Sequence, residues 1–501
     1  MRASHRQRTP KRKAASSLNH RRDPGPKLFG SLFVGPTWQG WRAVLRALFG
    51  LPMDEVESAL FRQLTGRTVA PTTQAREAYL IIGRRDGKSR IAALVAVFLA
   101  CFRSYKHVLS AGERGVIMLI ASDRKQARVL KRYVSGFLNA VPMLAAMIVN
   151  ETAESIELNN SIIIEIHTAS FRAVRGYTLV GVVLDELAFW PVDDSASPDS
   201  EIINALRPAM ATVPNALMLA ISSPYARRGE LYKAYEEHFG KDDDPVLVIQ
   251  GASRLLNPLI PRIIVDNAYA ADPMAASAEY GAEFRRDVKA FVSIEAVEAV
   301  TIPGRLELPH VAGLRYFGFV DPSGGSQDAM TLAVAHREQD RMILDLIREV
   351  VLPFSPEAVA KEFAETLKGY NVTKVVGDRY GGEWPREQFR KHGVEYQVSE
   401  RVKSDIYREC LPLPTSRCIE LLDHARLTTQ LQTLERRTGR GGKDSIDHAP
   451  QSHDDVANSC FGALLLCGSG PASMSLDQIG VMFDANAGLH RAWDDRWDRF
   501  S

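Results

Sequence analysis

Residues 83–89 read GRRDGKS and follow directly on the apolar run 78–82, with a strongly apolar run, 91–102, after them. A strand, a glycine-bounded loop and a helix in that order are typical of a phosphate-binding loop, where backbone N–H groups and the helix N-terminus hold phosphates. The loop departs from the standard spacing, since only three residues separate its first glycine from the Gly-Lys pair and Ile82 stands where glycine is expected. The alternative is a surface turn with an incidental lysine.

The whole loop is expected to contact a nucleotide. Lys88 would reach the β- and γ-phosphates, and Ser89 would ligate Mg²⁺. The residues expected to bind ATP here are Gly83, Arg84, Arg85, Asp86, Gly87, Lys88 and Ser89. Upstream, residues 36–42 read PTWQGWR, and Gln39 could recognise adenine through a bidentate amide contact. A helix start with a core pair of tryptophans is the alternative interpretation of that segment.

A second motif follows at residues 179–186, which read LVGVVLDE. An apolar strand that ends in two acids is typical of a Walker B motif, in which Asp185 would belong to the Mg²⁺ shell and Glu186 would activate the attacking water. The end of a strand is also where an open α/β sheet places its ligand. A further strand-like run, 215–221, ends in a small-residue segment that could sense the γ-phosphate and move a neighbouring element, or that is a plain turn. This segment is Ser222, Ser223 and Pro224.

Short apolar runs of strand length alternate with longer helical runs from residue 78 to 221, which indicates a parallel sheet covered by helices. From residue 313 on, three consecutive strand-like runs precede helices that alternate with strands, the order of a ribonuclease-H-like domain. Helices are expected there at 419–436 and 454–467. We therefore predict an α/β protein with an N-terminal P-loop ATPase domain, a parallel sheet flanked by helices, and a C-terminal ribonuclease-H-like nuclease domain with a mixed sheet. The predicted divisions are a basic disordered tail (1–27), the ATPase domain (28–250), a proline-bearing connector (251–312), the nuclease domain (313–468) and a C-terminal tail (469–501).

Carboxylates mark a second chemical site. The run 314–320 leads into Asp321, the run 373–377 leads into Asp378, and a helix starts at Asp454 and Asp455. Like charges that converge are costly unless cations neutralise them, which suggests a two-metal site that cleaves phosphodiesters by in-line displacement. We favour Asp455 over Asp454 as the main third ligand. Taken singly, an aspartate at a helix start is usually a cap or a partner of the helix dipole.

A basic, glycine-rich segment lies between these acids, at residues 435–444 (ERRTGRGGKD). Its composition fits contact with a phosphate backbone, and a solvated hairpin is the alternative. The residues expected to contact DNA are Arg436, Arg437, Arg440 and Lys443.

Overall charge and composition are ordinary. The net charge is +2, but residues 1–23 carry +7, which leaves −5 on the rest of the chain, so net charge does not by itself indicate a nucleic-acid-binding protein. The longest apolar run, 91–102, is too short to cross a membrane, which needs about 20 residues. Five cysteines without a CxxC pair indicate reduced thiols in a cytoplasm.

With these motifs together, residues 30–468 resemble the large terminase subunit of tailed double-stranded DNA bacteriophages. The resemblance rests on Trp38-Gln39, the loop GRRDGKS, Arg175-Gly176 before VVLDE, Ser222-Ser223-Pro224, the three nuclease acids and the run 438–455, TGRGGKDSIDHAPQSHDD. The family's loop also departs from the standard spacing and carries arginine.

The resemblance implies a packaging motor, whose ATPase translocates DNA into a procapsid and whose nuclease cuts the concatemer. It implies ATP with Mg²⁺ at the first site and two Mg²⁺ or Mn²⁺ at the second. The implied partners are double-stranded DNA, the portal protein, the small terminase subunit and further copies in a ring on the portal, with no membrane. The expected location is the bacterial host cytoplasm, with no retention in the mature virion. By analogy, Arg84 or Arg85 acts as an arginine finger in cis.

Two rival functions remain. One is a helicase-like ATPase with a nuclease, in DNA repair or mobile-element transfer. The other is a DNA-binding scaffold subunit with a degenerate ATP site. The second is disfavoured because Lys88, Ser89, Asp185 and Glu186 are all intact.

Overall fold

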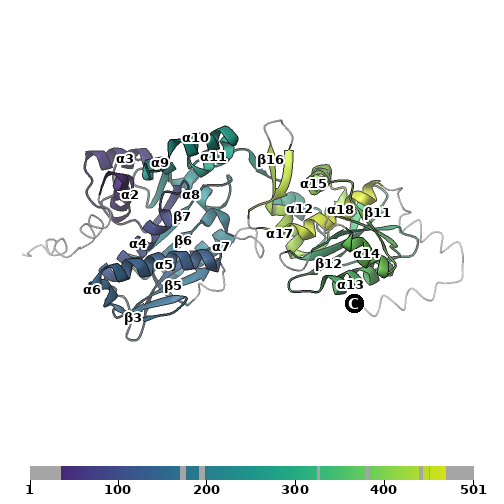
Figure 1. Cartoon of the computed structure of the whole chain (residues 1–501), viewed down its shortest axis with the longest axis horizontal. Coiled ribbons are helices and arrows are strands. Elements are labelled where there is room, and N and C mark those ends of the chain that lie inside the picture. The colour runs from purple at the N-terminus through teal and green to yellow at the C-terminus, as the bar shows by residue number, and fades with distance from the viewer. Residues whose placement is uncertain are drawn as a thin grey trace, which may run out of the picture. The chain divides into compact units, whose positions relative to one another are not determined.

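The computed structural model describes residues 35–169, 176–190, 198–323, 328–378, 383–438, 444–450 and 452–469. The chain divides into two compact units, which are described separately (Figure 1). Unit 1 comprises Met1–Trp190 and Asp199–Arg285, and unit 2 comprises Pro191–Pro198 and Arg286–Ser501. The division at Arg285 falls inside the predicted connector, 251–312, whose status as a separate segment stays a prediction. The predicted tail 1–27 lies outside the described residues, as does all but Ser469 of the tail 469–501.

Unit 1 is built on an eight-stranded sheet in the order β3-β4-β5-β2-β6-β7-β1-β8. The six strands from β5 to β8 pair in parallel, and β3 and β4 add an antiparallel edge. All residues of β2 and β7 are buried, as expected for parallel strands covered on both faces. The predicted parallel sheet is confirmed. Its strands are β1 (Glu77–Ile82), β2 (Gly115–Ala121), β3 (Ile148–Glu151), β4 (Ser155–Leu158), β5 (Ile162–Thr168), β6 (Thr178–Asp185), β7 (Leu217–Ser222) and β8 (Val246–Gly251).

Helices cover this sheet, and α4 and α5 pack side by side against it (Figure 1). The helix α4 carries apolar residues almost all round, because it is buried along nearly its whole length. The helices are α2 (Gln39–Phe49), α3 (Glu55–Thr65), α4 (Lys88–Phe102), α5 (Arg124–Ala140), α6 (Pro142–Ala145), α7 (Pro198–Ala209), α8 (Gly229–His238), α9 (Ser253–Leu256), α10 (Arg262–Ala271) and α11 (Pro273–Glu279), with 3₁₀ turns η1 (Pro36–Trp38) and η3 (Leu187–Phe189).

Unit 2 contains a six-stranded mixed sheet in the order β14-β13-β10-β11-β12-β15. The strands β10, β11 and β12 pair antiparallel, while β13 joins β10 in parallel and β14 joins β13 in parallel. Counted from β10, the order is 3-2-1-4-5, that of a ribonuclease-H-like sheet, so the predicted fold class is confirmed. The strands are β10 (Tyr316–Asp321), β11 (Met330–Glu338), β12 (Arg341–Val350), β13 (Lys374–Gly377), β14 (Glu395–Val398) and β15 (Ile419–Glu420).

The two faces of this sheet carry separate cores, because successive side chains of a strand point to opposite faces. Phe319 belongs to the core shared with α18 (Asp455–Ser469), whereas Val320 belongs to the core shared with α13 (Pro356–Gly369) and α14 (Trp384–Lys391). The helix α18 approaches β10 closely, since a Cβ added at Gly462 would overlap the ring of Phe319. This contact fixes the helix whose first residue is one of the predicted acids.

The predicted helix at 419–436 is wrong. Residues there form the short strand β15, then α17 (Ala425–Thr433), then β16 (Leu434–Thr438). The helix starts where His424 Nδ1 accepts a hydrogen bond from the Leu427 amide, and it ends because the following residues join a three-stranded sheet, β17-β16-β9. The remaining elements are β9 (Val288–Ala290), α12 (Ile294–Glu298), α15 (Lys403–Cys410), α16 (Pro412–Ser416) and β17 (Asp444–His448).

Within the described ranges, no helix combines the length and the apolar character needed to cross a membrane.

Candidate active sites

Hydrogen bonds to the buried Asp86 hold the loop between β1 and α4 in its conformation. The Lys88 amide donates to Asp86 Oδ1 at 2.9 Å, and Trp41 Nε1 donates to the Asp86 carbonyl oxygen at 2.8 Å. Gly87 has φ 95°, a left-handed conformation that glycine adopts without strain just before the first residue of α4. Burial raises the pKa of Asp86 to about 7, against the opposing charge of Lys88. Asp86 is therefore a buried brace of the loop.

Lys88 lies at the meeting point of three elements. Its Nζ is 3.1 Å from Glu186 Oε1 and donates to Ser223 Oγ at 2.6 Å. Glu186 directly follows β6, and Ser223 directly follows β7. Because β6 and β7 are parallel neighbours, their carboxyl ends meet at the same edge of the sheet. The structure thus brings together the predicted phosphate-binding lysine, the predicted base and one of the predicted coupling serines.

The predicted coupling segment contacts Glu186 more than once. Ser222 Oγ donates to Glu186 Oε2 at 3.4 Å, and the Ser223 amide donates to the same oxygen at 3.3 Å. Ser222 Oγ also accepts from the Ala188 amide at 3.2 Å, which ties the turn after β6 to the end of β7. Pro224 follows and is buried. A displacement of the Glu186 side chain would therefore also move the residues that follow β7, because they contact it directly.

Ser89 and Asp185 supply oxygen atoms for a cation. Ser89 Oγ is 3.5 Å from Asp185 Oδ2, and among the described residues no hydrogen-bond partner meets the buried Asp185 Oδ1. Burial and then the neighbouring Glu186 raise the pKa of Asp185 to about 7. A hydroxyl and an unsatisfied carboxylate oxygen are donors that Mg²⁺ prefers. The residues present therefore fit the implied ion.

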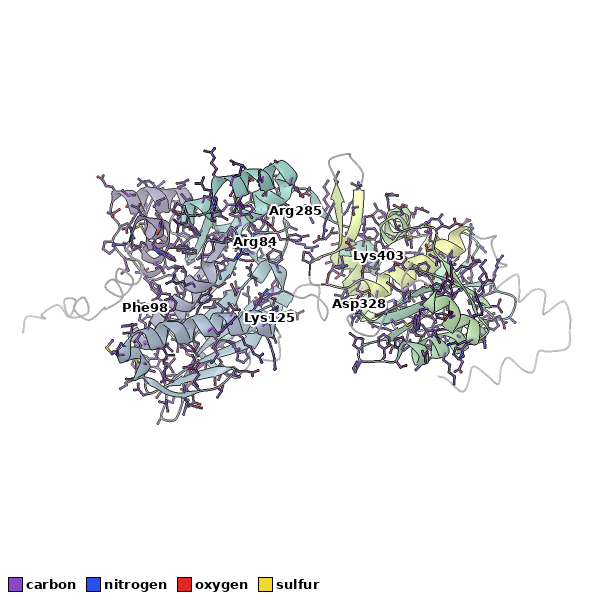
Figure 2. All side chains as sticks on the ribbon, in the orientation of Figure 1. Arg84, Phe98, Lys125, Arg285, Asp328 and Lys403 are labelled. Carbon is purple, nitrogen blue, oxygen red and sulfur yellow. The ribbon has the colours of Figure 1, made fainter. Side chains whose placement is uncertain are left out.

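The two arginines of the loop contact the segment that follows β8. The Arg84 amide donates to the Glu279 carbonyl oxygen at 2.6 Å, and Arg84 Nη2 pairs with Glu279 Oε1 at 3.3 Å. Asn257 Nδ2 donates to the Arg85 carbonyl oxygen at 2.7 Å. Both arginine side chains are exposed, and Figure 2 labels Arg84. Residues 251–285 thus provide partners for the loop, which nothing in the sequence indicated.

Gln39 is the first residue of α2. The start of this helix lies beside the loop, since the ring of Trp38 would be 4.0 Å from a Cβ built on Gly87. The guanidinium of Arg90 also lies over the Trp38 ring, 5.2 Å from its centroid.

In unit 2, two of the predicted acids meet. Asp321 ends β10, and Asp378 follows its parallel neighbour β13. Asn458 Nδ2 donates both to Asp321 Oδ2 at 2.8 Å and to Asp378 Oδ2 at 2.6 Å. Burial and then the charge of Asp378 hold the pKa of Asp321 well above its usual value, and burial also raises the pKa of Asp378. Two carboxyl groups thus lie side by side where their negative charge is disfavoured, and a bound cation would stabilise that charge.

The adjacent acids at the start of α18 differ in their surroundings. Asp454 is neutralised, since Lys403 Nζ is 3.0 Å from its Oδ2 and the Tyr407 hydroxyl donates to the same oxygen at 2.9 Å. Figure 2 labels Lys403. Asp455 Oδ2 is buried and meets no partner in the described part of the chain. Burial, then the charge of Asp454, raise the pKa of Asp455 to about 6.

No group of three or more His, Cys, Asp or Glu side chains among the described residues is arranged to hold a metal ion. The fit of a cation therefore rests on oxygen donors of mixed type. Besides Asp455 Oδ2, the buried Asn458 Oδ1 has no partner in the described ranges, and it lies on the amide that already bridges Asp321 and Asp378. Carboxylate and amide oxygens suit Mg²⁺ and Mn²⁺, so the donor chemistry fits the implied ions.

Sequence reasoning missed Asn458, Lys403 and Tyr407. A signal existed for Asn458, which lies three residues after Asp455 and therefore on the same face of a helix. Lys403 and Tyr407 lie about 50 residues before their partner Asp454, and no local pattern points to them.

The basic segment forms the arms of a hairpin, β16 paired with β17. Arg436 pairs with Asp444, and Arg437 Nη2 pairs with Glu435 Oε2 at 3.0 Å. Arg440 and Lys443 lie outside the described residues, and so does Arg175.

Comparison with known proteins extends these observations. Residues 60–239 match the family model described as "Terminase large subunit, ATPase domain". No curated protein matches the chain.

Solved structures give similarities at low identity. The HK97 bacteriophage large terminase is 16% identical over 85% of this chain and 99% of that chain, with a TM-score of 0.36. The large terminase of a thermophilic bacteriophage in complex with ADP is 11% identical over 79% and 95%, with a TM-score of 0.35. The large terminase nuclease from thermophilic phage G20c with bound magnesium is 15% identical over 35% and 98%, with a TM-score of 0.31.

The strand orders of the two sheets define the fold of each unit. The family match covers β1, the phosphate-binding loop, β6 with Asp185 and Glu186, and β7 with the serines that follow it. The expected resemblance is confirmed for this part of the chain, since residues 60–239 match the model of the terminase large subunit ATPase domain.

Proposed function

We propose that the chain is a phage terminase large subunit, which uses ATP hydrolysis to move double-stranded DNA into a procapsid and cuts concatemeric DNA with a metal-dependent nuclease site. The observation that carries the proposal is the meeting of Lys88, Glu186 and Ser223 at the edge of the sheet, inside the segment that matches the family. The paired acids of unit 2 supply the second activity.

For ATP hydrolysis, each described residue has a definite part. The backbone of residues 83–88 would hold the phosphates, and Lys88 would exchange Glu186 for the β- and γ-phosphates. Released from the lysine, Glu186 would orient and deprotonate the attacking water. Ser89 and Asp185 would hold Mg²⁺, which neutralises charge on the phosphates when bound.

Other residues would contact the nucleotide or couple ATP hydrolysis to the movement of DNA. Arg84 or Arg85, both exposed on the loop proposed to hold the phosphates, would supply the arginine finger in cis, and Gln39 would contact adenine. Ser222, Ser223 and Pro224 would transmit the change at Glu186, because both serines already contact it.

For DNA cleavage, Asp321, Asp378 and Asp455 would hold the two metal ions, with Asn458 as an added oxygen donor. Bound ions would activate water and stabilise the charge that develops on the phosphate. Lys403 neutralises Asp454, which supports Asp455 as the main ligand and Asp454 as the lesser one.

Contact with DNA and partners completes the proposal. Arg436, Arg437, Arg440 and Lys443 would meet the DNA backbone, and Arg436 would exchange its pairing with Asp444 for contact with a phosphate. We infer that portal protein, the small terminase subunit and further copies of the chain assemble with it in the host cytoplasm. A helicase-like ATPase-nuclease of repair or mobile-element transfer is the alternative.

The test is packaging in a defined mixture of the chain, ATP, linear duplex DNA and procapsids that carry the matching portal protein. We expect DNA to become resistant to added DNase only with ATP, and Lys88→Ala to abolish this protection. Lys125→Ala, which removes an exposed lysine of α5, is the matched control. ATP-dependent strand separation without protection of DNA would establish the helicase-like alternative instead.

A further inference from the structure

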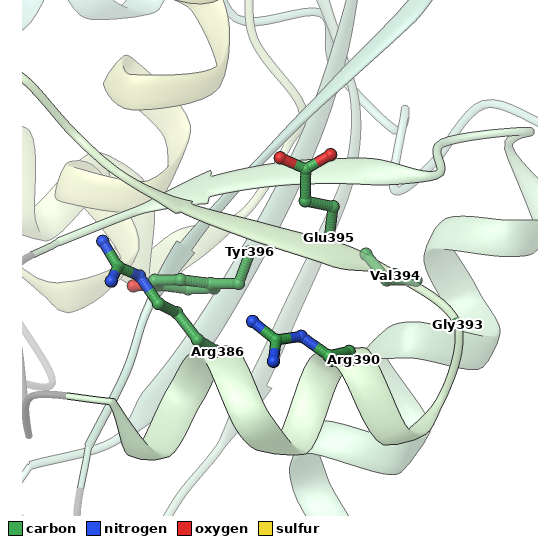
Figure 3. Close-up of a pocket in the computed structure, with 6 residues that line it drawn as sticks. All are labelled: Arg386, Arg390, Gly393, Val394, Glu395 and Tyr396. Atoms are coloured by element: carbon green, nitrogen blue, oxygen red, sulfur yellow. The ribbon is translucent and has the colours of Figure 1, made fainter.

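Unit 2 contains a pocket of about 170 Å³ between α14 and β14 (Figure 3). It is lined by Arg386, Arg390, Gly393, Val394, Glu395 and Tyr396. None of these residues belongs to the sites described above.

Two arginines define the chemistry of this pocket. Arg386 and Arg390 stand one helical turn apart on α14, and in Figure 3 the Arg386 side chain extends toward Tyr396 of β14 while that of Arg390 runs along the helix toward Arg386. Arg390 is exposed, and no acid among the described residues is within ion-pair distance of it. In the described part of the chain, the ion pair of Arg386 is with Glu383, whose side chain is 68% exposed, and such a contact contributes little in water. Two neighbouring guanidinium groups therefore lack a firm anionic partner.

The acid that lines the pocket does not neutralise them. Figure 3 shows the Glu395 carboxylate pointing away from both arginines, and its Oε1 instead accepts from Gln397 Nε2 at 2.8 Å. A guanidinium presents a planar fork of donors that matches the oxygens of a phosphate. The pocket is thus suited to a phosphate group.

Tyr396 connects this pocket to the acid pair. Its side chain is buried, and its hydroxyl donates to the Asp378 carbonyl oxygen at 2.8 Å. Tyr396 therefore both lines the pocket and contacts the main chain of Asp378, one of the acids proposed to act on DNA.

We propose that Arg386 and Arg390 bind a backbone phosphate of the DNA strand next to the phosphate that is cleaved. This inference rests on the proposed nuclease function and adds the residues that set the strand in register. They are positioning residues, because they hold the substrate and do not touch the acids.

The experiment measures binding of a short duplex by the full-length chain over a series of salt concentrations, in Ca²⁺ so that cleavage is slow. Each phosphate contact contributes about 0.9 to the slope of log K against log salt. Because the two arginines are proposed to hold one phosphate, the double variant Arg386→Ala/Arg390→Ala should lower that slope by about 0.9, and each single variant by less. Lys391→Ala removes an exposed charge from the same helix outside the pocket and should leave the slope unchanged.

Cleavage in Mg²⁺ supplies the second readout. The double variant should raise the KM for DNA far more than it lowers kcat, and the double lysine variant should recover the salt slope but only part of the KM. Far-UV circular dichroism and urea unfolding of the same preparations report that unit 2 is folded in each variant.

If the wild-type chain binds and cleaves DNA and the double variant keeps its slope and KM, the pocket is not a phosphate site. If the wild-type chain neither binds nor cleaves DNA, the nuclease proposal itself fails.

Discussion

Lys88 Nζ lies 3.1 Å from Glu186 Oε1, and the two side chains are 9% and 25% exposed. The first residue of α4 is thereby joined to the residue that follows β6. The lysine proposed to reach a phosphate is paired in this structure with the carboxylate proposed to reach a water. A bound γ-phosphate would compete with Glu186 for Lys88. The Glu186 carboxylate, once released, would be able to contact the attacking water.

Glu186→Gln should therefore keep ATP bound and slow its hydrolysis by about 10²–10⁴-fold, the usual contribution of a positioned base. Glutamine keeps the shape and the contacts with the serines after β7. Steady-state turnover and equilibrium binding of a labelled nucleotide measure the two effects. Glu154→Gln, an exposed glutamate of the same unit, serves as the control. Turnover within twofold of wild type would remove Glu186 from the role of base.

Lys403→Met should destabilise unit 2 by about 1–3 kcal/mol at neutral pH, because it leaves the buried Asp454 without its cation. This loss of stability is smaller than the loss expected for a fully buried ion pair, because the Lys403 side chain is 32% exposed. Adding Asp454→Asn to Lys403→Met should recover most of the lost stability, because the two residues interact and an asparagine leaves no unpaired charge. Urea unfolding of the four members of this cycle gives the coupling, and additive effects would show that the pair is not coupled.

Gly462→Ala should destabilise unit 2 by about 1–3 kcal/mol, because the new methyl group meets the ring of Phe319 and pushes α18 away from β10. The matched control is Gly136→Ala in α5, where no atom lies within 4 Å of the added Cβ. That change should stabilise the protein by about 0.5–1 kcal/mol through helix propensity. Thermal unfolding separates the two, and equal shifts would contradict the close packing of α18.

His336 should make the stability of unit 2 depend on pH. Burial lowers the pKa of His336, but its hydrogen bonds with Asp345 and Glu338 outweigh burial and raise the pKa above 6.5. The folded chain then binds more protons than the unfolded chain, so this stabilisation is complete below pH 6.5 and is lost as pH rises through the folded pKa. His336→Gln should cost more stability at pH 5.5 than at pH 9. Urea unfolding at both values measures the difference, and an equal or larger cost at pH 9 would contradict the sign.

The sequence predicted much of the fold because its strongest signals are local. Apolar strands, the glycine-bounded loop and the acids that end strands are all visible in short windows, and the rule that ligands lie at strand ends placed Asp321 beside Asp378. The predicted helix at 419–436 failed because its apolar spacing suits a helix, while the strand partners of residues 434–438 lie at 288–290 and 444–448. Pairing with strands outside the segment therefore determines its secondary structure.

The missed site residues share the same cause. Lys403 and Tyr407 are defined by contacts with Asp454, and the partners of Arg84 and Arg85 come from residues 251–285, far along the chain. Asn458 could have been found from its spacing after Asp455, but an asparagine within a helix carries no chemical signature until the two acids beside it are known.

The most direct test measures ATP turnover and DNA cleavage in parallel for Lys88→Ala and Asp321→Ala in the full-length chain. Lys88→Ala should abolish ATP turnover and leave Mg²⁺-dependent nicking of plasmid DNA, because Lys88 and Asp321 belong to different units. Asp321→Ala should stop nicking and leave turnover intact. Nicking at the wild-type rate by Asp321→Ala, or undiminished turnover by Lys88→Ala, would contradict the assignment of two separate active sites.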